Sequence, residues 1–261
     1  MLDVGGVPAF VHCGGVDFDP AKPAVVLVHG AGQDHSHFRF ITRALAHRGV
    51  SVAAPDLPGH GRSAGSAPDS IRGMAAWVVA LLDVLGVERA VLSGHSMGSL
   101  IALETAASAP DRVAGIVLTG SGESMPVHPD LQAAADEADR LAVELISGWV
   151  HSGSDRLGGH PQPGSWTRGI TDRLLERELE STLAGDLAAC ASYAAADRVS
   201  SVSCPITVVV ATEDVMTPAR AGRNLAATTG ARLIEVHGTG HNVVMEHPEP
   251  VLAEILRLVG G

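Results

Sequence analysis

The chain has 261 residues, of which 46% are hydrophobic, and it carries a formal net charge of −11 at pH 7. This length and apolar content suit one large hydrophobic core, and a single α/β domain of this size is ordinary. Nucleic acid and anionic membranes both repel an acidic surface, so we expect neither as a partner. Aromatic residues make up only 3% of the chain, which leaves Val, Leu, Ile and Ala to build the core.

The cysteines and the N-terminal residues indicate the compartment. Cys13, Cys190 and Cys204 are an odd number without C-x-x-C spacing, so neither a disulfide framework nor a zinc site is indicated. The first residues lack the basic and apolar regions of a signal peptide, and no run approaches the ~20 apolar residues of a membrane helix. We therefore expect a cytoplasmic protein, and the sequence leaves open whether it is a monomer or a homodimer.

Apolar strands alternate with helical patterns along most of the chain. Strands are predicted, in chain order, over 7–13 (a strand or hairpin), 24–29, 51–54, 90–92, 113–118, 205–211 and 232–236. Helices are predicted over 41–46, 70–85, 97–109 and 249–259. Continuously apolar strands that are separated by helices indicate a mostly parallel central sheet with helices on both faces.

One stretch interrupts this alternation. Roughly 80 residues, between the strand ending near Thr119 and the strand beginning at Pro205, contain no strand pattern, which is too long for a plain loop. They hold helical patterns over 131–147, 172–182 and 187–196, and a loop rich in Gly, His and Pro over 152–164. We expect residues 122–203 to form a helical lid, inserted after the sixth strand of a core domain made of residues 1–121 and 204–261.

The most specific motif is G-x-S-x-G at residues 94–98, which follows a short apolar strand and opens a helix. This order predicts a nucleophile elbow, a sharp strand-to-helix turn with Ser96 at its apex. Gly94 and Gly98 fit because a Cβ on either flank of the strained serine would clash with the neighbouring backbone. The turn also brings the backbone N–H of Met97 to a helix N-terminus, where a developing oxyanion is stabilised.

A serine hydroxyl is a weak nucleophile and needs a base, which a carboxylate orients. Asp214 and His241 each follow a predicted strand, and they come after Ser96 in the order that such a triad requires. These three residues are therefore the predicted catalytic residues.

Together these motifs resemble the α/β-hydrolase family over nearly the whole chain. H-G-x-G at 29–32 resembles the family's oxyanion loop, and D-x-x-G-x-G-x-S at 56–63 resembles a turn that follows its next strand. Asp214 with a proline four residues on, and G-x-G-H at 238–241, resemble its acid and histidine loops. The resemblance implies the α/β-hydrolase fold, in its lid-bearing, serine esterase-like branch.

The resemblance also implies a role for each residue. Ser96 attacks an acyl carbon, while His241 takes its proton and later activates the water that releases the acid. Asp214 holds the tautomer of the imidazole, and the backbone N–H groups of Met97 and Ala31 bind the oxyanion. No cofactor and no metal are expected.

Other interpretations of the same residues fit less well. Glu213 and Glu123 are competing acids, but the proline spacing favours Asp214. The histidines at 29, 35 and 37 resemble a metal cluster but lack a matching acidic pattern. Gly30-x-Gly32 resembles a dinucleotide fingerprint, yet His35 occupies the position of its third glycine.

A serine at position 96 argues against the family's dehalogenases and epoxide hydrolases, which need aspartate there. We predict a carboxylesterase, which hydrolyses a small-molecule carboxylic ester through an acyl-enzyme intermediate. A C–C bond hydrolase, a thioesterase, a lactonase or a signal receptor with little turnover are the alternatives. The residues predicted to bind substrate are Gly30, Met125, Leu145, Trp149, Trp166, Tyr193 and Met216.

Overall fold

The computed structural model describes residues 1–153 and 166–260, and its centre is a seven-stranded sheet in the order β3-β5-β4-β6-β7-β8-β9. β3 (Val11–His12) pairs antiparallel with β5 (Ser51–Pro55), and every other neighbouring pair is parallel. The parallel strands are β4 (Ala24–Val28), β6 (Ala90–His95), β7 (Val113–Thr119), β8 (Ile206–Ala211) and β9 (Arg232–Val236). β1 (Leu2–Val4) and β2 (Val7–Ala9) form a separate hairpin. This is the predicted mostly parallel sheet.

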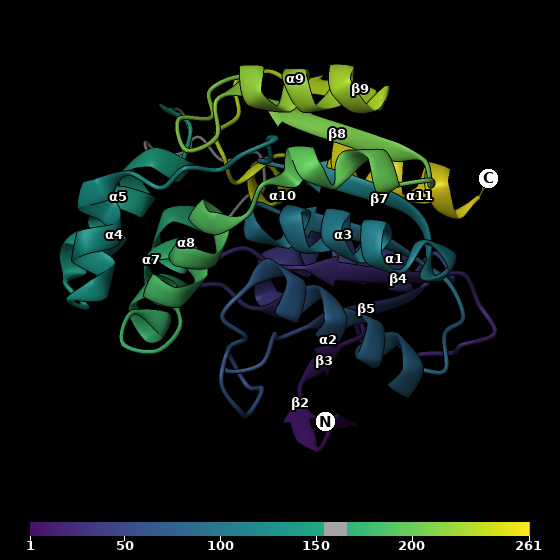
Figure 1. Cartoon of the computed structure of the whole chain (residues 1–261). Helices are drawn as coiled ribbons and strands as arrows, with labels where there is room; N and C mark the ends of the chain where they lie inside the picture. The colour runs from purple at the N-terminus through teal and green to yellow at the C-terminus, as the bar shows by residue number, and fades with distance from the viewer. Residues whose placement is uncertain (154–165, 261) are drawn as a thin grey trace.

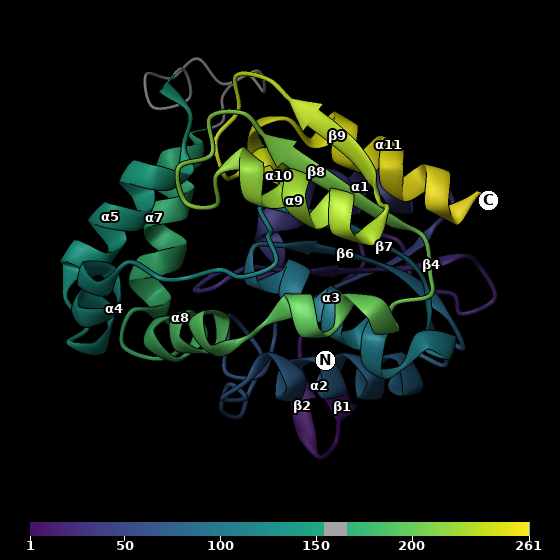
Figure 2. The same ribbon diagram turned by 45° about the horizontal axis from the view of Figure 1, so that its top comes forward.

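Two apolar clusters cover the two faces of the sheet, because successive side chains of a strand point to opposite faces. Val26 and Val28 belong to the cluster that includes α2 (Ile71–Val84), α3 (Met97–Ser108) and α9 (Ala219–Thr229). Val25 and Leu27 belong to the cluster on the other face. That cluster includes the helices α1 (Arg39–Ala46), α10 (Val243–Glu246) and α11 (Pro248–Val259). Figures 1 and 2 show the sheet between these two helical layers.

The helix boundaries follow local capping. The helix predicted over 70–85 is α2, and the Ser70 side chain accepts a hydrogen bond from the N–H of Gly73 at its start. α9 was not predicted. Gly230 caps its C-terminal end, because a φ of 65° is left-handed and cannot extend a right-handed helix. None of the helices in the described ranges is long and apolar enough to span a bilayer.

The segment between β7 and β8 is helical, as predicted. Its main helices, α4 (Pro129–Asp136), α5 (Arg140–Val150), α7 (Thr167–Glu178) and α8 (Leu183–Ser192), share an apolar cluster of their own. Two short 3-10 turns, η3 (Ala195–Asp197) and η4 (Val199–Ser201), lead back to β8. Figure 1 shows these four helices gathered at one end of the sheet, beyond the heads of its strand arrows. We call them the helical insertion.

Two details of this segment differ from the prediction or fall outside the description. The prediction of a single helix over 131–147 is wrong, because a turn between α4 and α5 interrupts the helix. Ala138 has a φ of 51°, and the Asp139 side chain accepts a hydrogen bond from the N–H of Leu141 to start α5. The loop predicted over 152–164 lies, from residue 154 on, outside the described residues.

The junction of β6 and α3 is the tightest turn of the fold. Ser96 has φ 53° and ψ −120°, and its N–H donates to the carbonyl oxygen of Thr119 at 2.8 Å. A Cβ at Gly94 would overlap the carbonyl oxygen of Gly98, and a Cβ at Gly98 would overlap that of Val28. Only glycine lets strand and helix approach this closely.

We expect Gly98→Ala to lower the free energy of unfolding by about 3 kcal/mol, because the added methyl meets the backbone of Val28, which has no room to move. Gly148→Ala is the matched control, since Gly148 lies in α5 with no atom within 4 Å of the new Cβ. It should stabilise the protein by about 0.5–1 kcal/mol, as alanine does in a helix. Urea unfolding of both variants measures the difference, and equal stabilities would contradict the close packing of the turn.

Candidate active site

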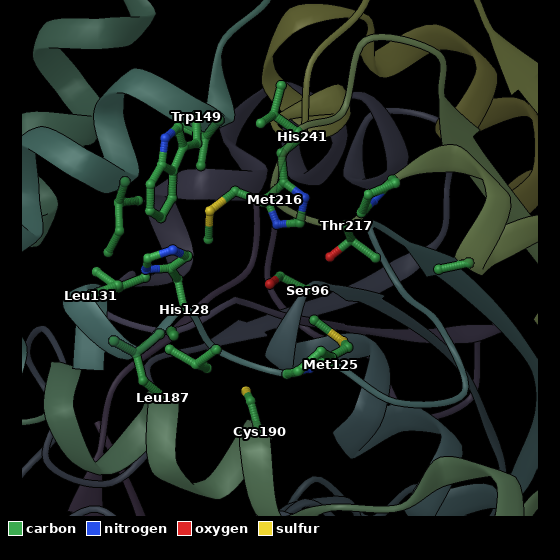
Figure 3. Close-up of a pocket in the computed structure, with 18 of the residues that line it drawn as sticks. Ser96, Met125, His128, Leu131, Trp149, Leu187, Cys190, Met216, Thr217 and His241 are labelled. Carbon is green, nitrogen blue, oxygen red and sulfur yellow. The ribbon is translucent and has the colours of Figure 1, made fainter. Parts of the chain in front are cut away.

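Ser96, Asp214 and His241 come from three loops at the same end of the sheet. His241 Nδ1 lies 2.8 Å from Asp214 Oδ2, and Asp214 Oδ1 accepts the N–H of Thr217 at 2.7 Å. Both Ser96 and His241 line one cavity, and Figure 3 shows the serine hydroxyl and the imidazole turned toward this shared space. Of the competing acids, Glu213 is exposed, and its carboxylate contacts the N–H of Gly153 instead of the imidazole.

Gly120, which the sequence analysis did not single out, lies against the imidazole ring of His241. Gly120 follows Thr119 at the end of β7 and has a φ of 59°. A Cβ at this position would lie 2.7 Å from Cε1 of His241 and 3.0 Å from its Nδ1. The His241 ring therefore packs directly on the backbone of the loop after β7, next to the carbonyl that holds Ser96.

Two backbone N–H groups are available beside the serine. Met97 is the first residue of α3, so its N–H precedes the intrahelical hydrogen bonds. Ala31 lies in the loop after β4, which its neighbours brace: Gly30 N–H donates to Gln33 Oε1, and Gly32 N–H donates to Asp186 Oδ2. Within the described ranges, neither Ala31 nor Met97 has a hydrogen-bond acceptor for its N–H.

The cavity has a volume of about 750 Å³ and lies between the sheet and the helical insertion. Ala31, Met125, Trp149 and Met216, four of the predicted residues, line it. The insertion contributes apolar side chains that the sequence did not single out, namely Leu131, Ile146, Leu187 and Cys190. No acidic residue is present among the described residues that line the cavity.

Three residues predicted to line a pocket lie elsewhere. Leu145 packs into the cluster of the helical insertion, and its neighbour Ile146 faces the cavity instead, because adjacent residues of a helix point in different directions. Trp166 is 69% exposed, with its ring over Gly169. Tyr193 donates its hydroxyl to Glu104 Oε2 at 2.7 Å, away from the cavity lining.

Gly30 and Met97, the other two predicted site residues, are buried and do not line the cavity. The backbone of Gly30 lies against the His95 carbonyl, so a Cβ there would be 3.2 Å from that oxygen. The Met97 side chain is fully buried in the apolar core and does not line the cavity.

Buried histidines pack behind His241. The rings of His95 and His241 have centroids 4.8 Å apart, and His37 lies 4.4 Å from His95 in turn. Burial, and then the neighbouring histidines, hold the pKa of His37 and of His95 well below the ordinary value. Burial, together with the nearby His60, lowers the pKa of His29 to about 4. These three side chains are therefore neutral at pH 7.

Asp56, the acid of the D-x-x-G-x-G-x-S motif, is held by hydrogen bonds to its own loops. Asp56 Oδ1 accepts from the N–H of His35 at 2.8 Å and lies 2.7 Å from His35 Nδ1, while its Oδ2 accepts from the N–H of Arg62. Asp34, His35 and Asp56 bring three possible metal ligands together, but the Asp34 oxygens already accept from Ser36 and Arg177. Hydrogen bonds within the protein thus occupy this cluster.

A buried polar network that the sequence did not reveal joins the helical insertion to the loops of the site. His60 Nε2 lies 2.8 Å from Asp186 Oδ2, and both side chains have zero exposure. His60 Nδ1 is 3.0 Å from the carbonyl oxygen of Pro58, which can only accept, so Nδ1 carries a proton. Burial favours the neutral ring, but the Asp186 carboxylate, the Pro58 carbonyl and Glu178 together outweigh it and raise the pKa of His60 above its ordinary value.

Comparison with known proteins now identifies the family. The Alpha/beta hydrolase family matches residues 25–254, and the chain belongs to this family. The pimeloyl-(acyl-carrier protein) methyl ester esterase of Aromatoleum aromaticum is 28% identical over 257 residues, which cover 92% of this chain and 99% of that protein. Hydrolase activity is what this family and this relative support.

Solved structures show the same fold. The enol-lactonase from Burkholderia xenovorans LB400 superposes with a TM-score of 0.86 at 20% identity, covering 99% of this chain and 98% of its own. Est816, described as an N-acyl homoserine lactone degrading enzyme, superposes with a TM-score of 0.79 at 27% identity over 98% of both chains. The predicted fold class is thus confirmed.

The buried neutral histidines predict sensitivity to acid. A histidine whose pKa is lowered in the folded state takes up its proton in the unfolded chain first, so stability falls as the pH drops below about 6.5. Each such histidine contributes a slope of about 1.4 kcal/mol per pH unit until its folded pKa is reached. We expect His37→Leu to reduce the slope of unfolding free energy between pH 6.5 and 5.

The exposed His47 provides the control, because His47→Gln should leave this slope unchanged. Urea unfolding at several pH values gives both slopes. Identical slopes for wild type and His37→Leu would show that His37 is not held neutral.

Proposed function

We propose that this protein is a serine carboxylesterase with the triad Ser96, His241 and Asp214. The observation that carries the proposal is the 2.8 Å distance between His241 Nδ1 and Asp214 Oδ2. The same imidazole lines a cavity together with Ser96, which lies on the strained turn between β6 and α3. A carboxylate at Nδ1 holds the proton there and leaves Nε2 free to act as a base.

In this mechanism, His241 Nε2 removes the hydroxyl proton of Ser96 as the oxygen attacks the carbonyl carbon of an ester. The N–H groups of Met97 and Ala31 stabilise the oxyanion of the tetrahedral intermediate. His241 then gives its proton to the leaving alcohol, which departs as the acyl-enzyme forms. A water molecule, deprotonated by His241, attacks the acyl carbon, and collapse releases the acid and restores Ser96.

The lining of the cavity favours a substrate whose acyl or alcohol group is apolar. Its walls are largely aliphatic side chains, two methionines and Trp149, and no described lining residue carries a negative charge. Arg220, in the first turn of α9, also lines the cavity and forms no ion pair within the described part of the chain. Neutral esters, and esters with a distal carboxylate, fit these walls better than cationic ones.

A lactone is the second candidate substrate. It is a cyclic ester, so the same triad opens it, and Est816 acts on N-acyl homoserine lactones by its description. The C–C hydrolase, thioesterase and signal-receptor alternatives rest on no particular contact of this structure.

We expect Ser96→Ala to reduce kcat/KM for p-nitrophenyl butyrate by at least about 10⁴-fold, because the nucleophile is lost. Asp214→Asn should lose about 10⁴-fold in kcat, because the imidazole no longer keeps the productive tautomer. Steady-state kinetics with the ester and with a γ-lactone measure both losses. Glu213→Gln, which changes the exposed neighbouring acid, serves as the control and should keep wild-type turnover.

Two outcomes would contradict the proposal. One is turnover that survives Ser96→Ala. The other is a single acylation of Ser96 without steady release of acid, which would favour a receptor.

The charge of the cavity predicts a preference among substrates. We expect p-nitrophenyl esters of butyrate and of glutarate (as the monoester) to be hydrolysed at least tenfold faster than that of 4-aminobutyrate, since no carboxylate compensates a buried ammonium. Arg220→Ala should lower kcat/KM for the glutarate monoester about 2- to 5-fold, as expected for one exposed ion pair, and leave the butyrate ester unchanged. Equal rates for the ammonium ester would contradict this picture.

A further inference from the structure

We propose that Asp186, on helix α8 of the insertion, is a positioning residue that holds the oxyanion loop in place through Gly32. This inference rests on the proposed function, because it assigns a task to a loop whose Ala31 N–H would bind the oxyanion. The direct contact is the hydrogen bond from Gly32 N–H to Asp186 Oδ2 at 2.9 Å, across 154 residues of sequence.

The same oxygen serves two donors. Asp186 Oδ2 accepts from Gly32 N–H and lies 2.8 Å from Nε2 of His60, which is fully buried with it. Since Nδ1 of His60 donates to the Pro58 carbonyl, the ring needs both protons to satisfy both partners. The imidazolium charge then compensates the buried carboxylate, and the carboxylate fixes the Gly32 peptide next to Ala31.

Packing reinforces this contact. Gly32 has a φ of 62°, and a Cβ there would lie 2.9 Å from Leu183 and 3.0 Å from Leu175 of the helical insertion. Side chains of α7 and α8 therefore pack directly against the oxyanion loop at Gly32. α8 also places Leu187 and Cys190 in the cavity wall. One helix thus contacts both the substrate space and the oxyanion loop.

A second tie runs in parallel. Glu178, at the end of α7, accepts from the N–H of Gly61 at 3.1 Å and from Arg177 Nε at 2.8 Å. Arg177 also reaches Asp34 Oδ2 at 2.8 Å, at the far end of the oxyanion loop. The helical insertion is consequently joined to the core at Gly32 and Asp34, which both follow Ala31, and at Gly61.

Asp186→Asn tests the role with almost no change in shape. The amide places either an oxygen or a nitrogen where Oδ2 was. The oxygen leaves a buried imidazolium without its counter-charge, and the nitrogen opposes the N–H of Gly32. Either way the loop loses its fixed position. We expect kcat for p-nitrophenyl butyrate to fall on the order of 10- to 100-fold, less than or equal to the loss of an oxyanion donor, with KM changed less than twofold.

Glu104→Gln is the matched control. Glu104 is also a buried acid, 2% exposed, but it binds Tyr193, Arg198 and Ser108 away from the catalytic loops. Both variants should melt at a lower temperature than wild type, and only Asp186→Asn should lose kcat. A boronic acid inhibitor, whose adduct places an oxygen in the oxyanion site, should bind Asp186→Asn more weakly by the same factor. An equal fall of kcat in both variants, or unchanged kcat in Asp186→Asn, overturns the proposal.

Measurements on the wild-type protein keep the proposal testable if Asp186→Asn does not fold. Nitrogen NMR should show His60 protonated on both ring nitrogens at pH 7, and hydrogen exchange should show the Gly32 amide protected while that of Ala31 exchanges faster. A neutral His60 or an unprotected Gly32 overturns the proposal. Absence of ester turnover in wild type, with Ser96 unlabelled by a fluorophosphonate, refutes the proposed function instead, and these two measurements still test the contact.

Discussion

The close approach of backbone to backbone around Ser96 is the constraint on which the rest of the site depends. Gly94 and Gly98 leave no room for a side chain, so strand β6 passes into α3 in the space of one residue. This forces Ser96 to a positive φ, which a residue with a side chain adopts only where the surroundings impose it. The cost is met by the packing of β6 at the centre of the sheet, between β4 and β7.

The parallel sheet then determines what surrounds the serine. Carboxyl ends of parallel strands lie at one edge, so the loops after β4, β7, β8 and β9 all open beside the elbow. These loops supply Ala31, Gly120, Asp214 and His241. The His241 ring packs on Gly120, and Thr119 just before it holds the N–H of Ser96. The end of β7 therefore positions both Ser96 and the His241 ring.

Local patterns predicted this part of the site, and they failed where the outcome depends on distant packing. The common location of Ser96, Asp214 and His241 could be predicted because each lies in a short motif directly after an apolar strand. Leu145 was chosen where Ile146 lines the cavity, since the sequence does not fix the rotation of an inserted helix about its axis. The pair His60 and Asp186 was out of reach, because 126 residues separate them and neither position has a distinctive spacing.

The buried pair of His60 and Asp186 also bears on whether the helical insertion can move. An ion pair with no exposure is weak evidence for stability, because desolvation of the two charges opposes their attraction, and apolar residues of the same volume often do as well. What such a pair does supply is a fixed geometry, since one carboxylate oxygen must meet two donors at once. A lid that opens freely would have to break this contact and the ties of Glu178 and Arg177 together. We therefore propose that the helical insertion is a fixed wall of the cavity, against which the loop after β4 packs.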